Sequence, residues 1–369
     1  MGSATEYSGC KVQRISGRNE SKRTFKMIAL KCKKILFLSV SFFKYERAIA
    51  KRLSELGAEV DFYDERPSNS NFSKGIIRLN KRFYHLKINN YYNRILDEIK
   101  GKKYDYFFLI KGEAIPVFFL EKIKNDNPGM DMIYYNFDPL TEYPNLIENL
   151  KYFDKKFTFE YNDSVKYNIS FRPLFYVDEY KSLQQYSQKP EYDIVFIGSA
   201  HTDRYIVGEK IRVMADRLNL KSYFYYYAMG RIAFRLKKMI DKNLKQFDIT
   251  KVSFDKLNHH QIIDFYKKTK SVLDINKPFQ NGLTIRTFEV LASGRKLITT
   301  NSDIKNYPFY CPENILVIDR EDIQLKPEFF VSDFKEIDQE VLYKMSLDSF
   351  IDCLFGEDQN DYWNSFRNN

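Results

Sequence analysis

The chain has 369 residues, of which 44% are hydrophobic, 29% charged and 17% aromatic. A domain usually has roughly 100 to 200 residues, so this length predicts two globular units, and the composition excludes collagen-like, low-complexity and wholly disordered proteins. The formal net charge of +10 would suit a polyanionic partner such as nucleic acid. However, the first 34 residues carry +7 of that charge and the rest carries only +3. We therefore do not expect a nucleic-acid partner.

The four cysteines are too scattered to indicate a disulfide scaffold or a zinc site, and no metal site is expected: they are Cys10, Cys32, Cys311 and Cys353. The longest apolar run covers residues 35–43, far short of the roughly 18 to 20 residues that span a bilayer. Residues 1–26 lack the apolar region of a secretory signal, and Met27 could be an alternative start. We therefore expect a cytoplasmic protein whose residues 1–26 form a disordered arm or a tag.

From residue 35 onward, short apolar runs alternate with amphipathic segments. The continuous run Ile-Leu-Phe-Leu-Ser-Val at 35–40 is typical of a parallel strand that is covered on both faces. Further strands are predicted at 58–63, 104–110, 132–136 and 153–159. Helices are predicted at 45–56, 88–99, 116–124 and 163–168. A Ser/Asn-rich loop is expected at 68–73. This alternation predicts a doubly wound, Rossmann-like domain over residues 27–170.

A second alternation follows residues 171–190, which have no sustained period and are predicted to be a linker. Strands are predicted at 194–197, 222–227, 271–275, 296–300 and 315–318. Helices are predicted at 208–218, 231–245, 261–269 and 287–292. They define a second Rossmann-like domain over 191–335. In the C-terminal segment 336–369, residues 338–354 repeat apolar side chains at helical spacing and are expected to pack back on a domain.

The densest motif is Asn281-Gly-Leu-Thr-Ile-Arg-Thr-Phe-Glu289. Here a polar loop opens directly into a helix, so backbone N–H groups and the positive end of the helix dipole can meet a phosphate. Thr284 can add a hydroxyl and Arg286 a charged fork to that phosphate. Glu289, about one turn inside the helix, can accept two hydrogen bonds from a ribose diol. The motif therefore predicts a nucleotide site.

The segment Phe288-Glu-Val-Leu-Ala-Ser-Gly294, followed by Leu-Ile-Thr-Thr at 297–300, resembles the nucleotide-binding helix of the GT-B glycosyltransferases. The likeness is to the group-1, family 4-like enzymes and especially to CgeB-like bacterial sugar transferases. Four further segments support it. Asp-Ile-Val-Phe-Ile-Gly-Ser at 193–199 and Lys-Ser-Val-Leu-Asp-Ile-Asn at 270–276 resemble donor-domain strands, and the stretches at 108–113 and 134–139 are similar to acceptor-domain segments. The resemblance covers about residues 33 to 320.

This resemblance implies a GT-B fold, in which two Rossmann-like domains face a cleft. The second domain would bind a nucleoside diphosphate sugar and the first an acceptor. The donor-binding residues would be Gly198, Ser199, Arg204, Asn281, Gly282, Leu283, Thr284, Arg286 and Glu289. The catalytic candidates are Asp138 and Glu113. The family usually has Glu at the position of Asn281, so the stereochemical outcome, retaining or inverting, stays open. The chain contains no Asp-x-Asp, which argues against the other large glycosyltransferase fold with its metal-bridged pyrophosphate. The GT-B resemblance therefore implies a metal-independent reaction without a cofactor, in which cations and a helix N-terminus stabilise the leaving diphosphate.

Several of these residues could instead have a purely structural role. Asp138 precedes a proline and could open a turn, Arg204 could be a solvated loop residue, and Arg286 could form a surface ion pair. Gly198 and Gly294 are expected to have a structural role in the backbone rather than to contact a ligand. The paired histidines His259 and His260 are expected to be exposed.

The basic amphipathic segment 231–245 would either rest on an anionic bilayer or be an exposed domain helix. The predicted function is a glycosyltransferase that builds a capsule- or lipopolysaccharide-type surface glycan on a lipid-linked acceptor at the inner face of the cytoplasmic membrane. Two alternatives stay open. One is a nucleotide-sugar 2-epimerase on the same fold, and the other is a non-catalytic basic protein that binds membrane or nucleic acid.

Overall fold

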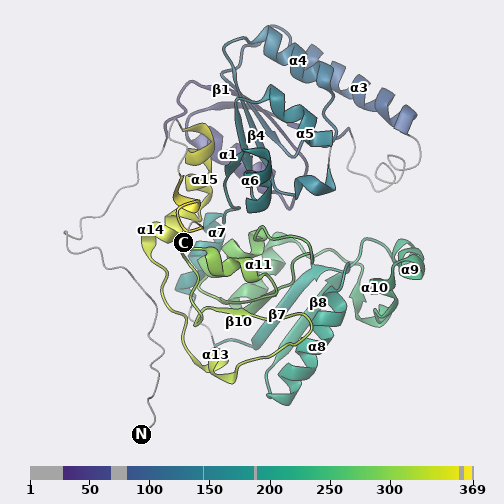
Figure 1. Ribbon diagram of the computed structural model, residues 1–369, viewed down its shortest axis with the longest axis vertical. Helices are drawn as coiled ribbons and strands as arrows, with labels where there is room; N and C mark the ends of the chain where they lie inside the picture. The colour runs from purple at the N-terminus through teal and green to yellow at the C-terminus, as the bar shows by residue number, and fades with distance from the viewer. Residues whose placement is uncertain (1–27, 68–80, 144, 187–188, 357–360, 368–369) are drawn as a thin grey trace, which may run out of the picture.

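The computed structural model describes residues 28–67, 81–143, 145–186, 189–356 and 361–367. The expected arm at 1–26 and the Ser/Asn-rich loop at 68–73 lie outside these residues. The chain forms two α/β halves, which are stacked one above the other in Figure 1. Each half contains one six-stranded sheet, and the two sheets share no strand.

All strand pairs of the first sheet are parallel, in the order β2-β1-β3-β4-β5-β6. The strands are β1 (Lys34–Ser39), β2 (Glu59–Asp64), β3 (Tyr106–Ile110), β4 (Asp131–Asn136), β5 (Lys155–Thr158) and β6 (Ser170–Phe171). Successive residues of β1, from Ile35 to Ser39, are all buried. Such a continuous apolar strand requires cover on both faces of the sheet.

Helices supply this cover on opposite faces. They are α1 (Tyr45–Glu55), α3 (Lys81–Glu98), α4 (Val117–Asp126), α5 (Asn145–Asn149) and α6 (Tyr161–Tyr167). Ile49 and Leu53 of α1 share a core with Phe37 of β1. Leu36, which points the other way, packs in a separate core with Tyr92 of α3. The alternation of side chains along β1 thus divides the first half into two apolar layers.

The second sheet is also parallel, in the order β12-β11-β10-β7-β8-β9. The strands are β7 (Tyr192–Ser199), β8 (Ser222–Tyr227), β9 (Val252–Ser253), β10 (Thr269–Asp274), β11 (Lys296–Thr299) and β12 (Ile315–Val317). The flanking helices are α8 (Arg204–Arg217), α11 (His259–Lys267), α12 (Ile285–Ala292) and α13 (Pro327–Val331). The sequence did not predict the two-residue strand β9, because so short a strand has no readable period.

Segment 171–190, predicted as a linker, contains α7 (Asp178–Lys181) and a 3₁₀ turn (Ser182–Gln185). The ring of Tyr180 is buried and lies 5.5 Å from the ring of Tyr266 in α11. Gln184 donates a side-chain hydrogen bond of 2.8 Å to the carbonyl of Ala292 in α12. The connection between the halves is therefore packed against the second sheet's helices.

Two predicted helices are each interrupted by a capping residue. Within 338–354, Ser346 accepts a hydrogen bond from the Ser349 N–H at 3.2 Å and separates α14 (Gln339–Lys344) from α15 (Leu347–Phe355). Within 231–245, Asp241 accepts from the Asn243 N–H at 3.0 Å and separates α9 (Arg231–Ile240) from α10 (Lys242–Lys245). The predictions of a single helix in each segment were therefore wrong. The breaks were missed because the apolar periodicity continues across both of them.

The C-terminal helices return to the first half, as Figure 1 shows. Phe350 of α15 packs edge to face on Tyr135 of β4, with ring centroids 4.7 Å apart. Arg52 of α1 binds both carboxylate oxygens of Asp348, at 2.6 and 2.9 Å. The two doubly wound halves and the returning helix confirm the predicted fold class.

Candidate functional site

The two halves meet at the carboxyl ends of their sheets, where parallel α/β sheets bind ligands. Lys277, which follows β10, donates to both carboxylate oxygens of Glu142 in the first half, at 2.7 and 3.0 Å. Glu160, at the start of α6, accepts hydrogen bonds from the backbone N–H groups of Asn281 and Gly282, at 3.2 and 2.8 Å. The loop that opens the nucleotide motif is therefore bound directly by the first half.

Gly282 allows this close approach. A Cβ atom at this position would lie 2.6 Å from the ring of Phe159 and 2.9 Å from its backbone oxygen. Such distances are well below van der Waals contact, so only glycine fits without displacement. Leu283, the next residue, is buried in the core that joins the two halves. These two predicted donor residues thus position the loop.

A cavity of about 260 Å³ lies between the halves beside α12. Phe43 and Tyr45, which follow β1, line its first-half side. Ile197 of β7 and Ile262 of α11 line the other side. The cavity is mostly apolar, as binding pockets for flat organic groups are.

Glu289 is the acidic group that lines this cavity. Its side chain is only 6% exposed, and burial raises its pKa to about 8. The Tyr266 hydroxyl donates a long hydrogen bond of 3.4 Å to its Oε2. A buried carboxyl with so few donors is well suited to accept hydrogen bonds from a ligand.

Arg286, one helical turn before Glu289, also lines the cavity. Its Nη1 lies 3.6 Å from Oδ1 of Asp274, a buried carboxylate at the end of β10. The Thr284 hydroxyl donates to Oδ2 of the same carboxylate at 2.6 Å. The Asp274 carboxylate therefore contacts the side chains of both Thr284 and Arg286. The Thr284 hydroxyl donates its proton to Asp274.

Two more arginines converge on the same edge of the sheet. Arg204, the first residue of α8, donates from Nε to the carbonyl of Ile275 at 2.9 Å. Burial, and then the charge of Arg286, lowers the pKa of Arg204 to about 10. Arg320 donates to the carbonyl of Asn276 at 2.6 Å and pairs with Asp203 at 2.6 Å. The edge is thus rich in cations that repel one another, which favours an anionic ligand.

The end of β7 completes this edge. The carbonyl of Ser199 accepts a 3.5 Å hydrogen bond from Nη1 of Arg204. A Cβ atom at Gly198 would lie 2.6 Å from the ring of Phe196, so a larger residue here would have to displace that buried ring. His201 follows, and burial together with the charges of Arg204, Lys237 and Lys277 lowers its pKa to about 3. Its imidazole is therefore neutral at physiological pH.

The two predicted catalytic carboxylates gather around Lys111 in the first half. Lys111 Nζ lies 2.9 Å from Asp138 Oδ2 and 3.5 Å from Glu113 Oε2. Glu113 also binds Arg66, whose neighbour Glu65 is fully buried, and that burial raises the pKa of Glu65 to about 8. Lys111 has φ of 74°, a left-handed conformation that is uncommon for a residue other than glycine.

Asp138 also faces the second half, since its Oδ1 lies 3.9 Å from Nζ of Lys277. Neither Asp138 nor Glu113 lines the 260 Å³ cavity. The structure therefore brings the two predicted carboxylates together around Lys111 and places both outside the cavity. His259 is half-buried, lines the cavity and pairs with Glu179, while His260 is exposed as expected.

Sequence reasoning missed Asp274, Arg320, Tyr266, Glu160 and Lys277. Asp274 and Lys277 carried a usable signal, because each is a polar residue at or just after the carboxyl end of a predicted strand. Glu160 carried none, since it binds backbone groups more than a hundred positions away in the sequence. Within the described part of the chain, no three His, Cys, Asp or Glu residues gather as a metal site would require. No helix there is long and apolar enough to cross a membrane.

No protein-family model matches the chain, and no curated protein matches its sequence. Solved structures do match in fold. The apo structure of OtsA is 10% identical over 91% of this chain and 94% of its own, with a TM-score of 0.52. An α,α-trehalose-phosphate synthase (UDP-forming) from Burkholderia xenovorans, in complex with glucose-6-phosphate, is 10% identical over 90% of this chain and 99% of its own, with a TM-score of 0.50.

A UDP-N-acetylglucosamine 2-epimerase from Rickettsia bellii also aligns, at 8% identity over 87% of this chain and 98% of its own, with a TM-score of 0.48. At these identities the matches bear on fold alone. The two facing parallel sheets match the two Rossmann-like domains of the glycosyltransferase neighbours. The chain has the GT-B fold.

Proposed function

We propose that the protein transfers a sugar from a nucleoside diphosphate donor to a hydroxyl group of a capsule- or lipopolysaccharide-type surface glycan, without a metal ion or other cofactor. One observation carries the proposal. The buried carboxyl group of Glu289 and the cation Arg286 line the same apolar cavity at the carboxyl edge of the second sheet. This combination suits the three chemical parts of a nucleotide.

The base would occupy the apolar cavity between Tyr45 and Ile262. Glu289 would accept hydrogen bonds from the ribose hydroxyls, which replace the solvation it lost on burial. Arg286, Arg204 and Arg320 would neutralise the diphosphate at the adjoining edge. Because these charges are fixed by Asp274, Ile275 and Asn276, little reorganisation is needed when the diphosphate leaves.

In the transfer, the bond between the anomeric carbon and the diphosphate oxygen breaks, and the acceptor oxygen bonds to that carbon. The acceptor proton needs a base if the configuration inverts. Asp138 is the better candidate than Glu113, because it lies within 4 Å of Lys277 of the donor half. The contact between Glu160 and the loop at 281–282 would help to exclude water from the donor.

The proposal is tested by measuring thermal unfolding with a panel of nucleoside diphosphates and their sugars. At least one of them should raise the Tm of the wild-type protein, because a ligand that binds only the folded state stabilises it. Glu289→Ala should abolish that rise. Glu321→Ala, which removes an exposed carboxylate of the same half, should leave it intact. A wild-type protein that no nucleotide stabilises would contradict the proposal.

Analysis of the reaction products then distinguishes a glycosyltransferase from an epimerase and from a non-catalytic binding protein. A glycosyltransferase needs both donor and acceptor, whereas an epimerase converts the nucleotide sugar when no acceptor is present. A non-catalytic basic protein would bind membrane or nucleic acid in a salt-sensitive way and would turn over no nucleotide sugar.

A further inference from the structure

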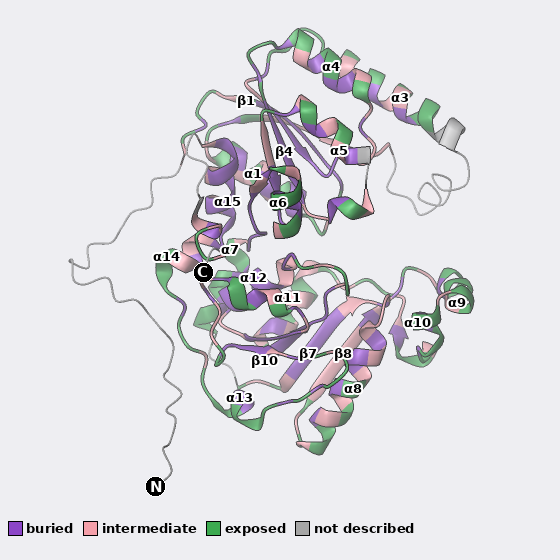
Figure 2. Ribbon diagram, in the orientation of Figure 1, coloured by how far each residue is buried: buried purple, intermediate pink, exposed green. Residues whose placement is uncertain are grey.

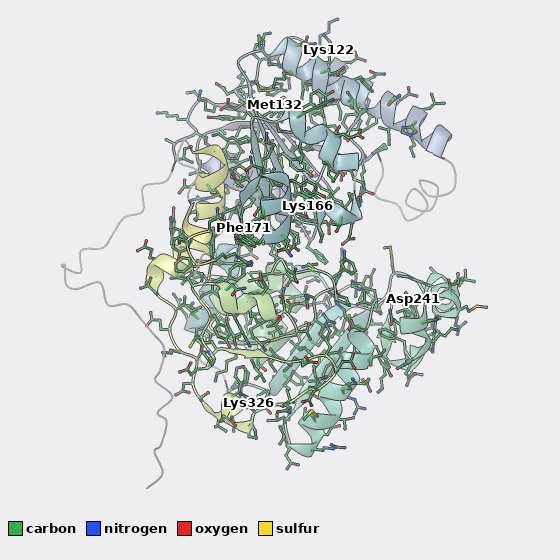
Figure 3. All side chains as sticks on the ribbon, viewed as in Figure 1. Lys122, Met132, Lys166, Phe171, Asp241 and Lys326 are labelled. Atoms are coloured by element: carbon green, nitrogen blue, oxygen red, sulfur yellow. The ribbon has the colours of Figure 1, made fainter. Side chains whose placement is uncertain are left out.

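The hairpin of α9 and α10 projects from the edge of the second sheet, as Figure 1 shows, and Figure 2 shows that α9 is mostly exposed. In Figure 3, Asp241 marks the turn between the two helices. One side of the hairpin packs into the core of the second half. Phe234 packs edge to face on Phe247, with centroids 5.7 Å apart, and both side chains are buried.

The opposite face of α9 is apolar and exposed. Ile232, Leu236, Met239 and Ile240 are exposed by 75%, 59%, 74% and 85%. Their positions correspond to i, i+4, i+7 and i+8, which form one continuous stripe on a helix. Met229, just before α9, is also exposed. Isolated exposed apolar residues are ordinary, but a continuous stripe of four on one helix indicates a surface that binds something.

Cations border this apolar stripe. By helical geometry, Arg235 lies along one side of it and Lys237 along the other, and both are exposed. Lys242 and Lys245 follow on α10 and are exposed as well. Within the described residues, none of these four cations forms an ion pair with a carboxylate. Long cationic side chains beside an apolar stripe can reach phosphate groups while the stripe enters the acyl boundary.

We propose that this face of α9 docks on an anionic lipid bilayer. Charge complementarity selects that partner, because the unpaired cations would meet anionic headgroups while the four long apolar side chains enter the acyl region. The hairpin would lie in the plane of the interface and would not span the membrane. Binding itself does not depend on the proposed sugar transfer.

The position of the hairpin suggests what docking would achieve. α9 follows the carboxyl end of β8, so it lies on the same edge of the sheet as the nucleotide site. Lys237 of α9 is close enough to affect His201 at the end of β7. A docked hairpin would therefore hold the cleft near the membrane surface, where a lipid-linked acceptor resides. This last step alone rests on the proposed function.

A tryptophan placed in the stripe tests the docking directly. The single native tryptophan, Trp363, is buried, so Leu236→Trp adds a reporter at the stripe. Val331→Trp, at an exposed position on α13 of the same half, is the matched control. The full-length variants are mixed, without nucleotide, with vesicles of brominated phosphatidylcholine and phosphatidylglycerol. Bromine should quench Leu236→Trp and leave Val331→Trp unchanged. Because quenching reports contact with acyl chains, binding through the basic residues at 1–34 alone would not produce it.

A second pair of variants measures how much the stripe contributes. Adding Ile232→Asp to the reporter should weaken vesicle binding by about tenfold, since it removes one large apolar group from the interface. Adding Val213→Asp, at an exposed site on α8, should change little. Equal quenching of both tryptophan reporters, or no quenching, would overturn the proposal. So would a dimer in sedimentation that Ile232→Asp dissociates, because the stripe would then bind a second copy. Nucleotide-induced Tm shifts, measured on the same proteins, report the proposed function separately.

Discussion

Asp138 and Glu113 share one lysine, yet they differ in what else they face. Asp138 lies near Lys277 of the second half, whereas Glu113 is bound to Arg66 within its own half. If the reaction inverts, Asp138→Asn should lower kcat by about 10² to 10⁴-fold, which is the usual contribution of a general base. Glu113→Gln should have a much smaller effect. Initial rates with saturating donor and acceptor measure both.

The donor-induced rise in Tm is the control for Asp138→Asn, since a properly folded variant keeps its nucleotide site. Equal rates for wild type and both variants would contradict an inverting reaction with either carboxylate as base. Departure of the diphosphate on the same face as acceptor attack, assisted by that diphosphate, would then explain the turnover.

At the scale of single elements, the loop at 281–282 depends on one glycine. Gly282→Ala would drive a Cβ atom into Phe159, so the loop or the ring must move. We expect the free energy of unfolding to fall by about 1 to 3 kcal/mol, as for other overpacked sites, and donor affinity to fall with it. Denaturant titration measures the first quantity and calorimetry the second.

Gly129→Ala is the matched control, because a Cβ atom there would meet no atom within 4 Å. It should change stability by a few tenths of a kcal/mol at most. If Gly282→Ala were as stable as Gly129→Ala, the loop would not be packed against Phe159 in solution.

The elements that the sequence predicts well are those whose signal is local. β1 and β7 are continuous apolar runs, and the motif at 281–289 brings Arg286 and Glu289 into one cavity because both lie on one helix. The breaks at Asp241 and Ser346 were missed, since apolar periodicity outweighs a single capping residue in a pattern search. The bond from Glu160 to the loop was not predictable, because the backbone groups that it binds have no side-chain signature.

At the scale of the whole molecule, three buried carboxyl groups make stability depend on pH. Burial raises the pKa of Glu65 and Glu289 to about 8 and that of Glu160 to about 7, against an ordinary value of 4.5. The folded state thus holds more protons than the unfolded state, and stability should fall as pH rises from about 6.5 to 8. Below that range, the depressed pKa of His201 acts in the opposite direction.

Thermal unfolding of the nucleotide-free protein at a series of pH values measures this dependence. Glu65→Gln should make the decline between pH 6.5 and 8 shallower, because one of the three titrating groups is gone. Glu121→Gln, which changes an exposed carboxylate on α4, should leave the slope unchanged. A Tm that rises across this range in the wild-type protein would contradict the burial of these groups.

The return of α15 to the first half also fixes an order of events during synthesis. Phe355 packs on Tyr106 and Phe108 of β3, and Phe350 on Tyr135 of β4, so residues 347–355 cover part of that sheet face. The last strand of the same sheet ends at Phe171. At a translation rate of about 5 to 20 residues per second, α15 emerges roughly 10 to 40 seconds later. During that interval the nascent first half presents an uncovered aromatic surface, and chaperones have that time to bind it before the chain's own C-terminal helix does.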